Sequence, residues 1–106
     1  MHPKALLDAT ADLVGLVLKF DHPADQVVSR FFRDHREFGP RERATLAETV
    51  YTVLRKKLLF DHLSPSGSGP KERRMAILGF HGPRDFLKSA LNDTEKRWLD
   101  NCDAVK

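Results

Sequence analysis

Hydrophobic residues recur at helical spacing through most of this chain, and the clearest case lies between residues 40 and 63. Apolar positions there fall three and four residues apart, which is the spacing of one helical face. They are Ala44, Ala47, Val50, Tyr51, Leu54, Leu58 and Leu59. Pro40 suits the first turn of a helix, because its missing N–H group needs no partner there. The pattern predicts a helix that runs to about Leu63 and allows a bend within it.

Two more helices are predicted before residue 40. The first opens at His2-Pro3, and its broad apolar face consists of Leu6, Leu7, Val14, Val17, Leu18 and Phe20. The second follows a cap at Asp21 or His22, with Pro23 in its first turn and Asp25 near its N-terminus. Its expected inward residues are Val27, Val28, Phe31 and Phe32, and its expected outward residues are Arg30, Arg33, Asp34 and Arg36. Gly39-Pro40 then ends this helix and starts the next.

The C-terminal part continues in the same way after a loop, Ser64–Gly69, that we expect to be flexible. Pro70 restarts a helix whose expected buried side is Met75, Ala76, Leu78 and Phe80. Gly82-Pro83 breaks it, and a short helix with Phe86, Leu87 and Leu91 follows. Asn92 and Glu95 have the spacing of a capping box, so a last helix starts there, anchored by Trp98 and Leu99.

No segment alternates apolar and polar residues over the length of a strand, and no internal repeat is visible. A chain of 106 residues can bury roughly 60–70% of the surface that its unfolded form exposes, enough for one modest core. We therefore expect a single all-α domain over residues 1–106, a compact bundle of about five to seven helices.

The charged residues are unevenly distributed along the chain. The sequence has 18 Lys and Arg against 15 Asp and Glu, a formal net charge of +3. The excess is mild, but it is concentrated mid-chain, as a directional cationic patch would require. Cys102 is the only cysteine, which excludes an internal disulfide and favours a reducing compartment. The sequence shows neither a signal peptide nor a membrane-spanning run, so we expect a cytoplasmic protein without membrane contact.

Catalytic chemistry has little support in the sequence. The five histidines, at positions 2, 22, 35, 62 and 81, never lie three or four residues apart, so we expect no metal site. No recognisable nucleophile motif occurs. Gly67-Ser68-Gly69 precedes a helix start, but no strand leads into it and the Lys-Ser/Thr pair of a P-loop is missing. The chain is therefore expected to bind a partner, and to hold no cofactor of its own.

Cations at the predicted helix ends are the candidate binding residues. Phosphate contacts are expected from Arg41, Arg43, Arg55, Lys56, Lys57, Lys71, Arg73 and Arg74. The last three lie beside a predicted helix N-terminus, where the helix dipole also attracts anions. The same cations could instead only solvate a helix face or offset the dipole at a helix C-terminus, and the sequence leaves both interpretations open. Tyr51 and Trp98 are expected to pack in the core.

The segment from Val27 to Leu63, and above all PRERATLAETVYTVLR, resembles the N-terminal domain of bacterial Sun/Fmu (RsmB-type) rRNA 5-methylcytosine methyltransferases. That domain is similar in fold to the RNA-binding antitermination factor NusB. The matching positions are Arg41, Glu42, Arg43, Ala44, Glu48, Val50, Tyr51, Leu54 and Arg55. The resemblance implies a NusB-like bundle that binds RNA. It also implies that S-adenosylmethionine and two active-site cysteines belong to a C-terminal catalytic domain absent from this chain.

The leading hypothesis is thus a non-catalytic domain that presents rRNA to a cytosine-C5 methyltransferase. The alternative is a docking module for a partner protein, or for its own catalytic domain, without direct RNA contact. Exposure of Phe31, Phe32, Phe38 or Phe60 as a contiguous apolar patch would favour this alternative. A DNA-binding helix-turn-helix at Gly39-Pro40 ranks last, because the middle of the following helix is mostly Ala, Leu, Val and Tyr.

Overall fold

The first helix, α1 (Pro3–Val17), begins as the sequence predicts. The computed structural model describes residues 2–63 and 71–105, with side chains described up to residue 102. The ring of His2 caps α1 by accepting a hydrogen bond from the backbone N–H of Lys4 at 3.2 Å. The helix ends at Val17, and Phe20, three residues further on, adopts a left-handed backbone conformation with φ of 56°. Phe20 is 62% exposed, so its predicted place on the buried face of α1 is wrong.

Helix α2 (Ala24–Asp34) buries Val28 and Phe31, while Val27 and Phe32 are half-buried. Its N-cap is Pro23, and no side chain caps it. The predicted cap at Asp21 or His22 is therefore wrong, because the helix starts one residue beyond the proline rather than with it. The arginines and Asp34 that were expected to point outward are exposed.

The predicted helix from residue 40 is bent into two, α3 (Pro40–Arg55) and α4 (Lys57–Leu63). The break falls at Lys56, with φ of −109°, inside the segment where the sequence pattern allowed a bend. The buried face of α3 is formed by Leu46, Thr49, Val50 and Val53. The predicted stripe is therefore displaced: Ala47, Tyr51 and Leu54 are only half-buried, and Ala44, Leu58 and Leu59 are exposed.

Two causes explain the displaced stripe. Thr49 belongs to the buried face although it is polar, because its hydroxyl donates to the carbonyl of Thr45 at 2.7 Å and accepts the backbone N–H of His81 at 3.0 Å. A buried hydroxyl is tolerated when its hydrogen bonds are made. The break at Lys56 then ends the α3 register, so Leu58 and Leu59 no longer follow its buried face.

Three helices complete the described chain: α5 (Lys71–Gly79), α6 (Arg84–Ser89) and α7 (Asp93–Val105). The expected flexible loop at 64–69 and the helix start at Pro70 lie outside the described residues. Met75 and Ala76 are buried as predicted, but Ile77 is also buried, whereas Leu78 and Phe80 are only half-buried.

The capping box at the start of α7 is confirmed. The backbone N–H of Glu95 donates to Oδ1 of Asn92 at 2.8 Å, and the backbone N–H of Asn92 donates to Oε1 of Glu95 at 3.1 Å. Trp98 and Leu99 are buried and anchor the helix. Local sequence therefore determines where α7 begins.

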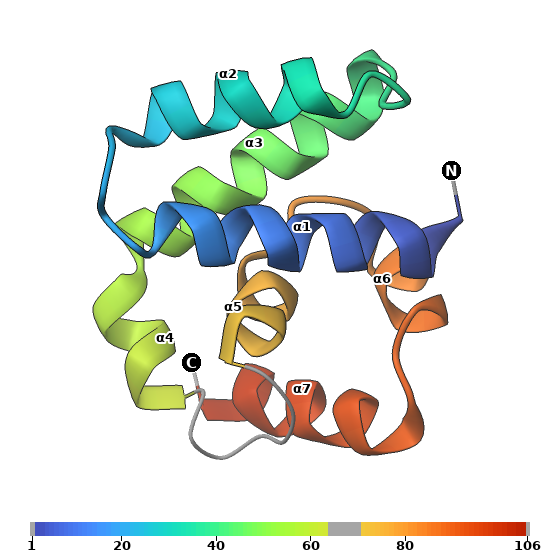
Figure 1. Cartoon of the computed structure of the whole chain (residues 1–106). Coiled ribbons are helices and arrows are strands. Elements are labelled where there is room, and N and C mark those ends of the chain that lie inside the picture. Colours follow the sequence, from blue (N-terminus) through green and yellow to red (C-terminus); the bar gives the residue numbers. More distant parts are fainter. Residues whose placement is uncertain (1, 64–70, 106) are drawn as a thin grey trace.

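Helix α1 crosses the middle of the molecule, with α2 and α3 on one side and α5 on the other (Figure 1). It contacts α2, α3, α5 and α6. Helices α3 and α5 approach closely at Gly79, where an added Cβ would lie 2.8 Å from Cγ2 of Val53. Over residues 2–63 and 71–105 the protein consists of seven helices without a strand, and its radius of gyration is 13.1 Å, as for a compact chain of this length. The predicted all-α bundle is confirmed.

Candidate nucleic-acid interface

The end of α3 carries an excess of positive charge. Arg55 and Lys56 are exposed, and neither forms an ion pair with a side chain that the structure describes. The Nη2 atom of Arg55 donates to the hydroxyl of Thr52 at 3.2 Å, which holds the guanidinium close to the helix end. Both charges therefore face solvent and are available to an anion.

Lys57 and Lys71 join this group through a shared carboxylate. The Nζ atom of Lys57 lies 2.7 Å from Oδ2 of Asp61, and the Nζ atom of Lys71 lies 3.2 Å from Oδ1 of the same residue. The hydrogen bond from Lys57 and then that from Lys71 lower the pKa of Asp61 below its ordinary value. We call Arg55, Lys56, Lys57, Asp61 and Lys71 the α3–α4 corner. Its four cations and one carboxylate leave a formal charge of +3.

A second cationic group lies where α3 begins. Arg33, Arg36, Arg41 and Arg43 form this α2–α3 corner, and all four are exposed. Arg43 bridges the two helices, because its Cζ atom lies 6.0 Å from the ring centroid of Phe32.

Carboxylates interrupt the α2–α3 corner. Asp34 and Glu37 are exposed and Glu42 is half-buried within the same stretch, so four arginines against three carboxylates leave a formal charge of only +1. The α3–α4 corner is therefore the stronger attractor for a polyanion.

The two corners do not form one patch. Arg41 and Arg55 lie near opposite ends of α3 (Figure 1), and at 1.5 Å per residue their backbones are about 21 Å apart. The sequence predicted these cations as one set of contacts. The structure instead groups Arg41 with Arg43 at one end, and Arg55, Lys56 and Lys57 with Lys71 at the other.

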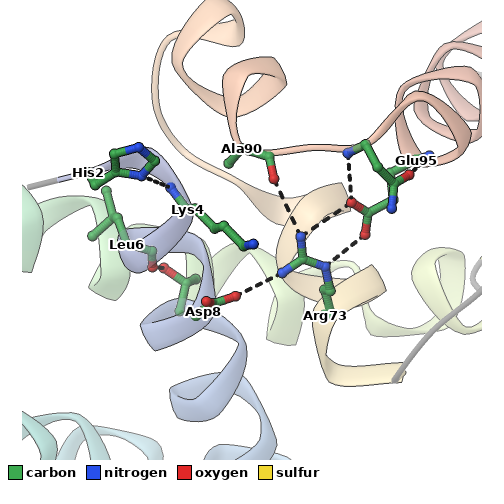
Figure 2. A network of polar contacts seen from close by, with 9 residues as sticks. His2, Lys4, Leu6, Asp8, Arg73, Ala90 and Glu95 are labelled. Carbon is green, nitrogen blue, oxygen red and sulfur yellow. Dashed lines mark hydrogen bonds and ion pairs between the residues drawn. The ribbon is translucent and has the colours of Figure 1, made fainter.

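Arg73 lies apart from both corners, in a network that joins α1, α5 and α7 (Figure 2). Its Nε donates to Oε2 of Glu95 at 2.7 Å and its Nη2 to Oε1 of Glu95 at 3.2 Å. Its Nη1 donates to Oδ1 of Asp8 at 2.9 Å, and Nη2 also reaches the carbonyl of Ala90 at 3.5 Å. Such a two-pronged arginine–carboxylate pair is among the strong ion pairs of proteins.

The electrostatics of this network stabilise its charged forms. The hydrogen bond to Glu95 raises the pKa of Arg73 despite its partial burial. Burial alone would raise the pKa of Glu95, but the hydrogen bonds from Arg73 and from the backbone of Asn92 lower it overall. The side chains of Arg73 and Glu95 are only 19% and 10% exposed. Arg73 is thus occupied inside the protein, and its neighbour Arg74 is half-buried, so neither belongs to the surface that we assign to an anion.

Sequence reasoning missed the role of Arg73 because its partners are remote. Glu95 was identified only as a capping residue, and the structure shows that the same carboxylate also pairs with Arg73. Asp8 lies 65 positions before Arg73. The only local signal was the capping box, which fixes where the Glu95 carboxylate sits.

The exposed apolar side chains differ from those that the docking alternative predicted. Phe31, Phe38 and Phe60 are buried, and Phe32 is half-buried beneath Arg43. The phenylalanine patch that would have favoured the docking alternative is therefore absent from the described surface. The large exposed apolar residues there are Leu16, Phe20, Leu58 and Leu59.

The hollowed part of the surface lies elsewhere. Two adjoining grooves, with volumes of about 670 and 650 Å³, run along α1 and α2 and share Leu16, Lys19, Phe31 and His35. Their walls carry charges of both signs, which does not suit a polyanion. Within residues 2–63 and 71–102, no group of three or more His, Cys, Asp or Glu side chains could hold a metal ion. No helix in the described part of the chain is long and apolar enough to cross a membrane.

Comparison of this chain with known protein families, with curated proteins and with solved structures finds no match. The functional argument therefore depends on the geometry of the two corners and on the resemblance of residues 27–63.

Proposed function

We propose that this domain binds structured RNA through the α3–α4 corner, and that it is the targeting domain of an S-adenosylmethionine-dependent rRNA cytosine-C5 methyltransferase. The observation that carries the proposal is the charge of +3 on five neighbouring residues, with Arg55 and Lys56 exposed and outside any ion pair among the described side chains. In this proposal the domain performs no chemistry and acts in the cytoplasm on rRNA.

The mechanism is electrostatic. Lysine and arginine side chains neutralise phosphates and release the counterions that surround them, which makes binding strong at low salt and largely independent of sequence. The α2–α3 corner supplies a weaker second contact. Because the corners are about 21 Å apart along α3, an RNA that touches both must be folded or long enough to span that distance.

The wider assignment comes from the resemblance. Arg41, Arg43 and Arg55, which carry part of that resemblance, are exposed at the two ends of α3. The methyl donor and the catalytic cysteines would belong to a C-terminal domain outside this chain. The domain described here would hold the RNA while that domain modifies it.

The protein-docking alternative lacks the feature that would have favoured it, because Phe31, Phe38 and Phe60 are buried and Phe32 is half-buried. The exposed leucines of α4 are few and lie among cations. We therefore keep RNA as the proposed ligand of this surface.

The test is the affinity for a structured rRNA fragment across a salt series. Four phosphate contacts at about −0.7 each predict a slope near −3 in a plot of log K against log salt. A flat salt dependence, or no binding at low salt, would contradict the proposal.

A further inference from the structure

Leu58 is the most exposed large apolar residue of the described chain, at 88%. Its neighbour Leu59 is 41% exposed, whereas Phe60 and Leu63 of the same helix are 2% and 6% exposed. The break at Lys56 produces this split, since it turns one side of α4 into the core and leaves Leu58 in solvent. A single exposed leucine is ordinary, but this one lies inside the α3–α4 corner.

Positive charges lie close to Leu58 along the chain, on its N-terminal side. Arg55 and Lys56 precede it by three and two residues, so their backbones lie no more than about 11 Å away. Lys57 is adjacent to it. The corner therefore combines a small apolar surface with exposed cations on its N-terminal side.

The size and surroundings of this apolar surface indicate which ligand it fits. A stable protein interface needs about 800 Å² on each partner, and lysine is depleted from such interfaces. Two leucines are too small a surface for such an interface, and the lysines beside them are of the residue type that such interfaces avoid. An unpaired nucleotide does fit, because the face of its base is small and apolar and the phosphates on either side of it are anionic.

We propose that Leu58 supports an unpaired RNA base while Arg55 and Lys56 hold the adjoining phosphates. The preferred ligand would then be a single-stranded loop or bulge, whose bases can leave the stack and lie on a protein surface. A continuous duplex keeps its bases stacked, so no base face is exposed for Leu58 to contact. This inference rests on the proposed RNA-binding function and specifies the class of RNA.

The experiment compares two RNA probes of equal length, a hairpin with a long unpaired loop and a blunt duplex. Leu58→Ala is expected to weaken hairpin binding about fourfold, the equivalent of about one methylene group no longer buried under the base. Leu58→Phe, which offers a flat ring, is expected to strengthen it. Both variants should leave duplex binding unchanged. Leu16→Ala is the matched control, because Leu16 is an exposed leucine on α1, 42% exposed.

The outcomes separate the inference from the function on which it rests. If the unmodified protein binds neither probe at low salt, the proposed function fails, and the inference with it. If it binds both probes and Leu58→Ala changes neither affinity, or both equally, only the inference is overturned. It is also overturned if Leu58→Ala leaves RNA affinity unchanged and abolishes self-association in sedimentation, since Leu58 would then contact a second copy.

Discussion

Arg73 and Arg55 are both arginines in similar basic runs, KERR and LRKK. The structure nevertheless places one in an ion-pair network and leaves the other exposed to solvent. Arg73 is held by Glu95 and Asp8 and is largely withdrawn from solvent. Arg55 is exposed and bonds only to a threonine hydroxyl among the described residues. The difference shows that a run of cations does not reveal its role. The role of each cation depends on whether the fold brings a carboxylate from elsewhere in the chain into contact with it.

The two settings also predict opposite consequences of losing the charge. Removing one member of a buried ion pair leaves an uncompensated charge and commonly costs about 3–5 kcal/mol of stability. Removing an exposed cation usually changes stability by less than about 0.5 kcal/mol. Arg73 should therefore matter for folding, and Arg55 for binding.

The largest effect is expected for Arg73→Ala. This variant should lower the free energy of unfolding by about 3 kcal/mol, because it leaves Glu95 buried without its cation. Urea denaturation measures the change, and Arg55→Ala, with an expected change within about 0.5 kcal/mol, is the matched control. Equal losses for the two variants would remove the distinction between these arginines.

Glu95→Gln tests the same network with pH. The pKa of Glu95 is lowered in the folded protein, so its contribution to stability is present above the ordinary value of 4.5 and is lost as pH falls through the lowered pKa. Glutamine can still accept from the backbone of Asn92 in the capping box, and Asp8 still pairs with Arg73, so the loss at neutral pH should be smaller than for Arg73→Ala.

The measurement for Glu95→Gln is the free energy of unfolding from pH 7 down to about 3. The variant should show a shallower decline below about pH 5 than the unmodified protein. A residual slope is expected, because the pKa of Asp61 is also lowered and contributes with the same sign. Parallel curves would show that the charge of Glu95 does not contribute to this dependence.

Binding variants sharpen the comparison between the two corners. Arg55→Ala with Lys56→Ala should reduce the salt slope of RNA binding by about 1.4, the value for two phosphate contacts. Arg41→Ala with Arg43→Ala should reduce it less, since carboxylates already offset much of the charge of the α2–α3 corner. Isothermal titration at several salt concentrations gives both slopes. A larger effect at the α2–α3 corner would make it the main contact instead.

The smallest effect on stability is expected for the two lysines that pair with Asp61. Lys57→Ala or Lys71→Ala alone should change stability by less than about 0.5 kcal/mol, because partly exposed ion pairs contribute little and the other lysine still pairs with Asp61. Thermal unfolding measures this change. A loss comparable to that of Arg73→Ala would show that Asp61 is a structural centre.

The features that could be predicted from sequence are local. The helix start at His2-Pro3 and the capping box at Asn92 depend on residues close together in the chain, and the structure confirms both. The buried face of α3 was misplaced because Thr49 is buried through a hydrogen bond to His81, 32 positions away.

The candidate site was predictable only in part, for the same reason. Arg55 and Lys56 are identified by their position at a helix end, and the structure leaves them exposed. The pairing of Arg73 with Glu95 and the meeting of Lys57 with Lys71 at Asp61 depend on how α5 and α7 pack. The exposure of Leu58 depends on the break at Lys56. Hydrophobic periodicity alone places Leu58 on the same buried face as the apolar residues of α3.

The most direct test of the central claim compares two variants with the same net charge. One removes Arg55 and Lys56, and the other removes Lys4 and Lys19, which are also exposed but lie on and just after α1. Affinity for the structured rRNA fragment is measured across the same salt series. The account predicts that only the Arg55→Ala/Lys56→Ala variant loses affinity beyond the small effect of net charge, with a slope shallower by about 1.4. Equal losses and equal slopes for both variants would show that overall charge attracts RNA, and would contradict a binding surface at the end of α3.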